Sequence, residues 1–387
     1  MKITGISASL VNAGLRNWVF VRVDTSEPGL YGIGEATLEW QSRAVVTRVE
    51  EFEPLLVGQD PRNISRLWEQ MYRYPFFRGG AVTMSAISGI DQALHDISAK
   101  ALGVPLWQML GGLTRDRVQM YDHVGGGKSE AVYGDLTASI GDKVRESKEA
   151  GFRAIKILAV PKTRPVDGIG VLKEADNTMA QARDAAGDDM DIMIDFHGRT
   201  TAAMAIQYAK VFEPYRPLFI EEVVQPEMPP QEMAKVAQQT TIPLAAGERL
   251  FHRREFLGLF ESGAISVAQP DVCHAGGVTE TMRIGALAGT YGVHLAPHNP
   301  LGPVATMVNI HIGFALPNFL IQEVMRGDVP WRDDVVTGVA PIVGGFVEPP
   351  TTVGIGVDID WDEAAKHPYI YTDPIQWTHN DGSTAEW

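Results

Sequence analysis

Two patterns of apolar residues follow one another in the first third of the chain. A loose alternation of apolar and polar residues predicts the strands of an antiparallel meander, at residues 3–11, 18–23 and 31–35. From residue 42 to about residue 110, apolar residues return at helical spacing instead, which predicts amphipathic helices. Gly111 and Gly112 mark the end of this α+β region.

After residue 116 the pattern changes to short apolar runs separated by stretches of helical periodicity. The runs lie at residues 118–121, 154–158, 191–194, 219–220, 242–245, 264–268, 293–296 and, as an eighth candidate, 320–321. This alternation is typical of a parallel α/β architecture. Because the runs are evenly spaced and no G-x-G-x-x-G motif opens a helix, we predict a TIM-like barrel rather than a Rossmann fold. Functional residues in such barrels follow the C-terminal ends of the strands.

Acidic residues stand where three consecutive runs end. Asp195, Glu221 and Glu248 follow the third, fourth and fifth runs, and they are 26 and 27 residues apart, about one strand–helix unit. Consecutive strands would therefore bring all three to the same rim. Oxygen ligands without cysteine suit a hard cation such as Mg²⁺. The alternative, three unrelated acids at helix N-termini, does not explain the repeated spacing.

Two histidines are placed to join these carboxylates. His197 stands two residues after Asp195, so on a strand both side chains would point the same way. His298 ends the seventh run, and Asp271 at the end of the sixth run could hydrogen-bond its imidazole and fix the tautomer. A structural role is the alternative for each histidine, and the neighbouring carboxylates favour a catalytic one.

Two further charged residues belong to the same rim. Glu323 follows the eighth run and could polarise a substrate oxygen or accept a hydrogen bond. Lys156 lies within the second run and could contact substrate as a base or Schiff-base former. We favour a supporting role for Lys156, in which its charge balances the acidic cluster.

The composition argues against several other classes of protein. The 387 residues carry a net charge of −15 and no Lys/Arg-rich block, so no nucleic-acid partner is expected. No apolar stretch approaches the roughly 20 residues that span a bilayer, and no signal-peptide core opens the chain, so we expect a cytoplasmic protein without membrane contact. We interpret the single cysteine, Cys273, as a small packed side chain rather than a nucleophile.

The polar segments after the runs resemble the enolase superfamily, and the resemblance covers nearly the whole chain. The matching motifs are Asp195-Phe196-His197-Gly198-Arg199, Ile220-Glu221-Glu222, Gly247-Glu248-Arg249, Gln269-Pro270-Asp271, Ala296-Pro297-His298 and Gln322-Glu323. Within the superfamily the chain is most similar to sugar-acid dehydratases, above all to D-galactonate dehydratases. That narrower resemblance rests on residues 76–80, 90–94, 214–219, 274–277 and 385–387.

The resemblance implies an α/β fold with a modified TIM barrel of the (β/α)7β type beneath an α+β capping domain. The capping domain would comprise residues 1–115 with a C-terminal tail from about 356 to 387, and the barrel would comprise residues 116–355. It also implies that the protein forms a homo-oligomer. Its small-molecule partner would be a sugar acid substrate, and its place would be in sugar-acid catabolism. By the same resemblance, Asp195, Glu221 and Glu248 would bind Mg²⁺, which holds the substrate carboxylate and stabilises an enediolate.

The resemblance also implies roles for the remaining site residues. His298, paired with Asp271, would remove the C2 proton, and His197 would protonate the departing 3-hydroxyl to give a 2-keto-3-deoxy acid. Glu323 would hydrogen-bond near the substrate carboxylate.

Other residues leave the substrate open. Tyr121-Asp122-His123 is similar to the first strand end of mannonate dehydratases, so mannonate or gluconate is an alternative to D-galactonate. His123 either contacts the substrate or has a structural role, and the sequence favours neither. Asn17 and Trp18 lie either on a loop that closes over the site or in an ordinary hairpin turn.

Departures from the superfamily's patterns bear on the reaction. Racemases and cycloisomerases of the superfamily carry Lys-x-Lys where this chain has Lys156-Ile157-Leu158. The missing second lysine favours dehydration, with a racemase, epimerase or cycloisomerase as the alternative. Residues 160–176 and 324–331 differ from galactonate enzymes, so the sequence does not fix which sugar acid is used. A non-catalytic metal-binding scaffold would lack a ligand or a base, and neither is missing.

Overall fold

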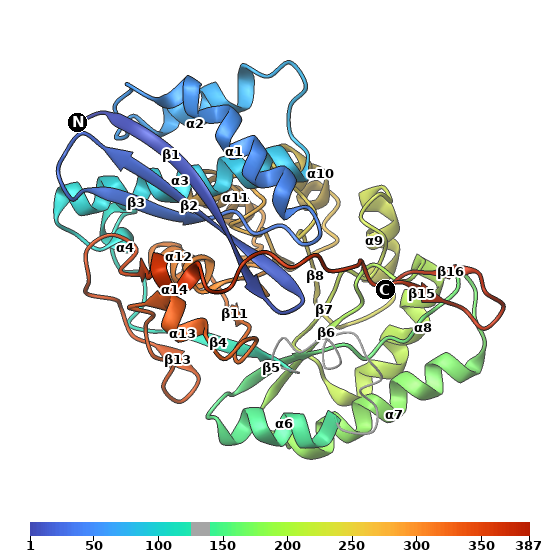
Figure 1. The fold of residues 1–387 in the computed structure, drawn as a ribbon. Coiled ribbons are helices and arrows are strands. Elements are labelled where there is room, and N and C mark those ends of the chain that lie inside the picture. Colours follow the sequence, from blue (N-terminus) through green and yellow to red (C-terminus); the bar gives the residue numbers. More distant parts are fainter. Residues whose placement is uncertain (125–139) are drawn as a thin grey trace.

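The computed structural model describes residues 1–124 and 140–387. Its N-terminal part contains a three-stranded antiparallel sheet in the order β1–β2–β3, built from Ile3–Ala13, Arg16–Thr25 and Tyr31–Glu35 (Figure 1). Four helices follow: α1 (Ser42–Leu56), α2 (Ile64–Arg73), α3 (Ala81–Leu102) and the short α4 (Leu106–Met109). The predicted meander and the helical region after it are confirmed.

Glycines in β3 let this sheet lie directly on α3. A Cβ added to Gly32 would stand 2.0 Å from the carbonyl oxygen of Ala93, and one added to Gly34 would stand 2.0 Å from that of Gly89. Such distances are impossible for real side chains, so glycine is required where strand and helix backbones touch. This close contact fixes the loop after β3, which reaches the candidate site described below.

Within the described residues, eight parallel strands form the barrel. Their order follows the chain, and β11 pairs with β4. A bridge between Leu295 and Phe319, just ahead of β11, closes the ring on the other side. The strands are β4 (Val118–His123), β5 (Ala154–Ile157), β6 (Asp191–Asp195), β7 (Phe219–Glu221), β8 (Leu244–Ala246), β9 (Val267–Ala268), β10 (His294–Leu295) and β11 (Gln322–Val324).

Each of the first seven strands is followed by a helix before the next strand begins. These helices are α6 (Ile140–Glu149), α7 (Ile169–Ala186), α8 (Ala202–Phe212), α9 (Pro230–Ala237), α10 (Arg253–Glu261), α11 (Gly277–Thr290) and α12 (Pro303–Ala315). No long helix follows β11 among the described residues; the next helix along the chain is the four-residue α13 (Arg332–Val335). The predicted modified TIM barrel of the (β/α)7β type is therefore confirmed. Its division into two domains stays a prediction.

The eighth strand lies further along the chain than its apolar run indicated. Residues 320–321 were predicted as the strand and Gln322-Glu323 as its polar end. The structure instead pairs Gln322–Val324 with β4, so Glu323 lies within β11. A fully buried polar side chain such as that of Glu323 does not register in a hydrophobic pattern.

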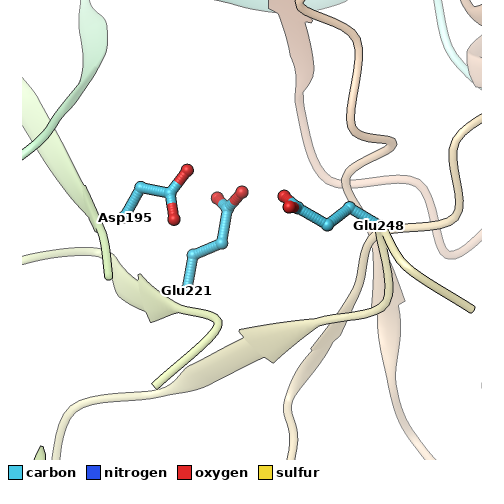
Figure 2. A group of neighbouring side chains, drawn as sticks. All are labelled: Asp195, Glu221 and Glu248. Carbon is cyan, nitrogen blue, oxygen red and sulfur yellow. The ribbon is translucent and has the colours of Figure 1, made fainter. Parts of the chain in front are cut away.

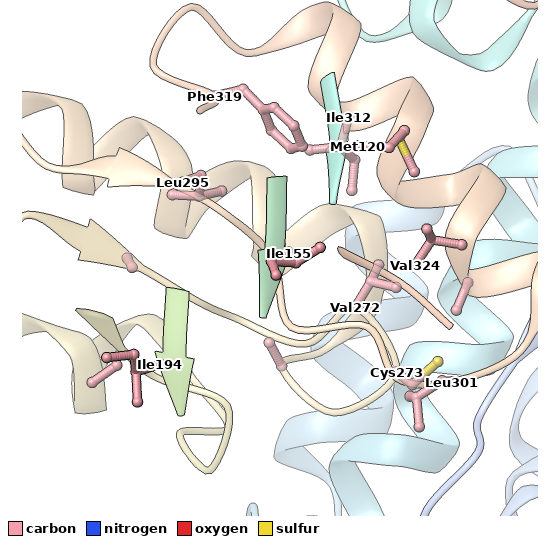
Figure 3. Close-up of a cluster of buried hydrophobic side chains, with 14 of the residues drawn as sticks. Met120, Ile155, Ile194, Val272, Cys273, Leu295, Leu301, Ile312, Phe319 and Val324 are labelled. Atoms are coloured by element: carbon pink, nitrogen blue, oxygen red, sulfur yellow. The ribbon is translucent and has the colours of Figure 1, made fainter. Parts of the chain in front are cut away.

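Apolar side chains pack on both faces of the barrel sheet. One buried cluster draws a residue from each strand or its immediate flank, and it fills the interior: Tyr121, Ala154, Met193, Phe219, Ala245, Val267, Ala296 and Ile321. The alternate residues, such as Ile155, Ile194 and Leu295, belong to the larger cluster that also includes helix residues such as Ile312 (Figure 3). Cys273 is fully buried in that cluster, as its structural interpretation predicts.

Short elements complete the chain after the barrel. They are β12 (Val336–Thr337), β13 (Phe346–Val347), β14 (Asp358–Ile359), α14 (Trp361–Ala364), β15 (Trp377–Thr378) and β16 (Thr384–Ala385). Beyond α14 the chain returns to the N-terminal sheet, where Asn17 exchanges two hydrogen bonds with the backbone of Ile370. Within residues 1–124 and 140–387, no helix combines the length and apolarity needed to cross a membrane.

The buried imidazole of His311 predicts a pH dependence of stability. Its Nδ1 accepts from the Trp107 N–H at 3.2 Å and its Nε2 donates to the Ile355 carbonyl at 2.9 Å, so the neutral ring satisfies both partners. Burial lowers the pKa of His311 to about 4 from an ordinary value of 6.5. The unfolded chain therefore binds more protons between these values, and the contribution of His311 to stability falls as pH falls.

We expect this contribution to decrease by about 2 kcal/mol between pH 7.5 and pH 5. Urea unfolding of the wild type and of His311→Gln at both pH values measures it. The glutamine variant, which has no group to protonate there, should lose about 2 kcal/mol less. Equal losses in the two proteins would show that His311 does not carry the effect.

Candidate active site

Three carboxylates converge at the C-terminal rim of the barrel. Asp195 ends β6 and Glu221 ends β7, and the parallel register places them directly opposite each other. Glu248 follows two residues after β8. One oxygen of each lies within 4.8 Å of the others (Figure 2). The predicted convergence is confirmed, and its physical cause is the shared register of neighbouring parallel strands.

Lys156 reaches this cluster from β5. Its Nζ lies 2.8 Å from Glu221 Oε1, 2.9 Å from Glu323 Oε1 and 3.5 Å from Asp195 Oδ2. Burial favours the neutral amine, but the surrounding carboxylates prevail and hold the pKa of Lys156 well above its usual value. Its ammonium group thus offsets part of the negative charge of the acidic cluster, the supporting role we favoured from the sequence.

One ammonium does not neutralise the cluster. Burial, followed by the negative charge of Asp195, raises the pKa of Glu248 to about 8. Its Oε2 is buried without a hydrogen-bond partner in the described part of the chain. An all-oxygen donor set with an orphaned carboxylate oxygen fits a hard divalent cation, whose charge would restore the ionised form.

His197 stands next to Asp195, but not for the expected reason. β6 ends at Asp195, and His197 lies in a turn with φ of 52°, so strand alternation does not orient it. Its backbone N–H donates to Asp195 Oδ1 at 2.8 Å, and its Nε2 lies 3.2 Å from Asp195 Oδ2. The turn therefore folds back on the carboxylate that precedes it.

The hydrogen bonds of His197 define its tautomer. Arg199 Nη2 lies 3.3 Å from His197 Nδ1. A guanidinium only donates, so Nδ1 accepts and the proton of the neutral ring sits on Nε2. Burial lowers the pKa of His197 to about 4, which keeps the ring neutral. His197 thus presents an N–H toward the carboxylate cluster.

His298 stands at the other end of the cluster. Its Nδ1 lies 2.8 Å from Asp271 Oδ2, and its Nε2 lies 3.5 Å from Glu248 Oε2. The predicted contact between His298 and Asp271 is confirmed. Burial holds the pKa of His298 well below its usual value and raises that of Asp271, while the Cys273 N–H, 2.7 Å from Asp271 Oδ1, favours the carboxylate.

Glu323 lies beneath the cluster rather than on the cavity surface. It is fully buried, and besides Lys156 it binds His123 Nδ1 at 3.0 Å and the Asn299 N–H at 2.7 Å. Burial opposes its ionisation, but Lys156 and His123 together lower the pKa of Glu323. His123 itself lines the cavity, and its Nε2 has no hydrogen-bond partner among the described residues.

The cluster opens into a cavity of about 310 Å³. The barrel contributes His123, Asp195, His197, Glu248, Arg249, His274 and His298 to its lining. The other walls come from residues 38–41 after β3, Ala81 at the start of α3, and Glu386 with Trp387. Its size is within the usual range for a small-molecule site.

Asn17 and Trp18 do not lie on a loop that closes over the site; they belong to the β1–β2 hairpin, close to its turn, as the alternative expectation had it. Both lie in β2 and are buried, and neither lines the cavity. The turn comes earlier, at Gly14, whose φ of 77° permits it. Residues 38–41 stand over the site instead, because the close contact of β3 with α3 directs the chain there.

Sequence reasoning assigned no role to several residues of the site. Gln269 Nε2 donates to Glu221 Oε2 at 2.7 Å and orients that ligand. His274 lines the cavity with Nδ1 2.9 Å from Ser85 Oγ. Gln269 follows a strand directly, so its position was a usable signal. Trp40 and Trp387 come from distant segments, and no pattern along the barrel indicates them.

Comparisons with known proteins agree with this arrangement. Residues 139–364 match the family model "Enolase C-terminal domain-like". Residues 3–111 match the model "Mandelate racemase / muconate lactonizing enzyme, N-terminal domain". Together the two models cover the N-terminal sheet and helices and most of the barrel.

Solved structures are similar over nearly the full chain. An enolase from Agrobacterium radiobacter, provisionally assigned as a galactarate dehydratase and bound to Na and L-malate, is 31% identical with a TM-score of 0.89, over 100% of both chains. A member of the enolase superfamily from Salmonella Typhimurium is 31% identical with a TM-score of 0.87, over 95% of this chain and 98% of its own. An enolase from Pantoea ananatis with bound D-gluconate and Mg is 28% identical with a TM-score of 0.85, over 95% of each chain. The chain belongs to the enolase superfamily.

Proposed function

We propose that this chain is a Mg²⁺-dependent dehydratase of an aldonic acid. It removes the proton next to the carboxylate and eliminates the 3-hydroxyl, which gives a 2-keto-3-deoxy acid. The observation that carries the proposal is the pair of histidines at the two ends of the carboxylate cluster, beside Asp195 and Glu248. Their hydrogen bonds suit opposite tasks, because elimination of water needs one base and one acid.

Asp195, Glu221 and Glu248 would hold the cation. The donor set and the orphaned Oε2 of Glu248 support this assignment, as does Mg in the related Pantoea ananatis protein. Bound Mg²⁺ supplies positive charge that binds the substrate carboxylate and makes the neighbouring C–H bond more acidic.

His298 acts as the base. With Asp271 ionised, the Nδ1 proton of His298 is held in the 2.8 Å hydrogen bond, and its Nε2 keeps a lone pair on the side of Glu248. The Cys273 N–H stabilises that carboxylate, so the pair has a fixed orientation and tautomer. Nε2 takes the C2 proton of a substrate whose carboxylate lies at the cluster.

His197 acts as the acid. Its Nε2–H faces the cluster because Arg199 occupies Nδ1. It gives this proton to the 3-hydroxyl oxygen as the C3–O bond breaks, so water leaves rather than hydroxide. The resulting enol takes up a proton at C3 and becomes the 2-keto acid.

The alternative reaction is racemisation, epimerisation or cycloisomerisation on the same scaffold. Lys156 does not support such a reaction as a second base. Its ammonium group is bound between Glu221 and Glu323, and its raised pKa keeps it protonated. D-Galactonate is our first candidate substrate. D-Gluconate is the next candidate because the related Pantoea ananatis protein binds it. Galactarate follows, because the related Agrobacterium radiobacter protein is provisionally assigned as a galactarate dehydratase. A homo-oligomer remains our expectation.

A colorimetric 2-keto acid assay across C4 to C6 acid sugars tests the proposal. It is run with Mg²⁺ and after treatment with EDTA. We expect one or two acids, D-galactonate first, to give product with Mg²⁺ and none with EDTA. Product that persists after the metal is removed, or silence on every acid while Mg²⁺ binds, would contradict the proposed reaction.

A further inference from the structure

A hairpin far from the barrel strands in sequence closes over the acid side of the site. β15 pairs antiparallel with β16, and Trp387 follows two residues later. The dark red chain in Figure 1 reaches this hairpin from the N-terminal sheet, where Asn17 holds Ile370. The hairpin contacts the turn between β6 and α8, which carries His197 and Arg199.

Loops at the barrel rim hold the hairpin from below. Lys162 Nζ donates to the Thr378 carbonyl at 3.2 Å, and Arg164 Nη2 lies 2.7 Å from Asp381 Oδ2. The loop after β7 adds a hydrogen bond of 3.1 Å from Gln225 Nε2 to Glu386 Oε1. These contacts place the hairpin above the turn that follows β6.

Two tryptophans, Trp377 in β15 and Trp387 just after β16, pack against Arg199 and His197 respectively. The Arg199 guanidinium stacks on Trp377, with Cζ 4.5 Å from the ring centroid, and the same guanidinium contacts His197 Nδ1. Trp387 meets the imidazole edge-on, with ring centroids 5.3 Å apart. Trp387 also packs edge-on against Trp40, which carries the contact to the N-terminal part.

We propose that the hairpin and the residues after it, 377–387, position His197 as the acid. Trp377 fixes Arg199, and Arg199 keeps Nδ1 an acceptor so that Nε2 carries the proton. This inference rests on the proposed function, because it takes His197 to be the acid. Trp377 does not line the cavity, so it acts as a positioning residue through Arg199 rather than on the substrate.

Trp377→Ala separates this role from the base side of the reaction. D-Galactonate and D-gluconate are the probes, with Mg²⁺ in D₂O, and ¹H NMR follows the C2 proton while the keto acid is assayed. We expect dehydration to fall about 10- to 100-fold, the scale of a misplaced acid. Exchange of the C2 proton by His298 should stay within about twofold of the wild-type rate.

Two variants serve as references. Trp377→Phe keeps an aromatic face for Arg199 and should restore most of the dehydration rate. Tyr371→Ala changes an exposed side chain of the same C-terminal segment and should leave both rates unchanged. Equal losses of exchange and dehydration in Trp377→Ala, or no loss of either, would overturn the proposal.

A second readout needs no substrate. We expect ¹⁵N-histidine NMR spectra of the protein with Mg²⁺ to show an unprotonated Nδ1 and a protonated Nε2 for His197. The signals of the His197 ring are assigned as those that disappear in His197→Asn. Trp377→Ala should mix the two tautomers, and an unchanged tautomer would contradict the proposal. If the wild type neither exchanges the C2 proton of any acid sugar nor forms a keto acid, the proposed function fails. The NMR spectrum still decides, independently, whether the hairpin sets the tautomer of His197.

Discussion

His298→Asn is expected to abolish both the dehydration of the acid sugar and the exchange of its C2 proton. The side chain keeps a polar group beside Asp271 but has no basic nitrogen to take the proton. General-base catalysis of this kind contributes about 10²- to 10⁴-fold, so the rates should fall by at least that range. The keto acid assay and ¹H NMR in D₂O measure the two losses together.

His197→Asn provides the matched comparison, because it removes the acid and leaves the base. Dehydration should fall on a similar scale while C2 exchange continues. Both variants should bind Mg²⁺ as the wild type does, since neither histidine belongs to the carboxylate cluster. Retained dehydration in His298→Asn would remove His298 from the mechanism, and exchange lost in both variants would show that the roles are not divided.

Lys156→Met is expected to lower the free energy of unfolding by about 3–5 kcal/mol at pH 8 without metal, the usual loss when a buried ion pair is broken. Methionine has a similar length, so the main change is that Glu221 and Glu323 lose their buried counter-charge. Urea unfolding in EDTA measures the loss. Addition of Mg²⁺ should stabilise the variant more than the wild type, because the cation replaces part of the missing charge.

The sign of the pH dependence follows from the same charges. Without Lys156 the buried carboxylates hold protons more tightly than they do in the unfolded chain, so lower pH stabilises the variant. Its deficit should therefore shrink between pH 8 and pH 6. Lys235→Met, which removes an exposed ion pair with Glu232, should change stability by less than about 1 kcal/mol. A Lys156→Met protein as stable as the wild type would show that the charge of Lys156 does not stabilise the buried carboxylates.

The part of the site that follows barrel geometry was predictable from the sequence. Asp195, Glu221 and Glu248 end neighbouring strands, and parallel register brings such ends together. His298 and Asp271 meet for the same reason, from the ends of adjacent strands. A regular scaffold turns spacing along the chain into proximity in space.

The remaining features depend on irregular backbone and on long-range packing. His197 reaches Asp195 through a left-handed turn, which strand alternation does not describe. Trp377 lies in a hairpin that follows the barrel by many residues and Trp387 lies just after that hairpin, so only tertiary contacts place them at the site. Asn17 does not close over the site, because the turn is formed at Gly14 rather than at the polar residues that follow it.

The most direct test of the central claim is the fate of the C2 and C3 hydrogens when the wild type acts on D-galactonate in D₂O with Mg²⁺, followed by ¹H NMR. We predict a 2-keto-3-deoxy acid that has lost its C2 proton and carries a solvent deuteron at C3. Deuterium at C2 of an acid whose 3-hydroxyl is retained, with inversion at C2 and no keto acid, would contradict dehydration and establish a racemase or epimerase instead.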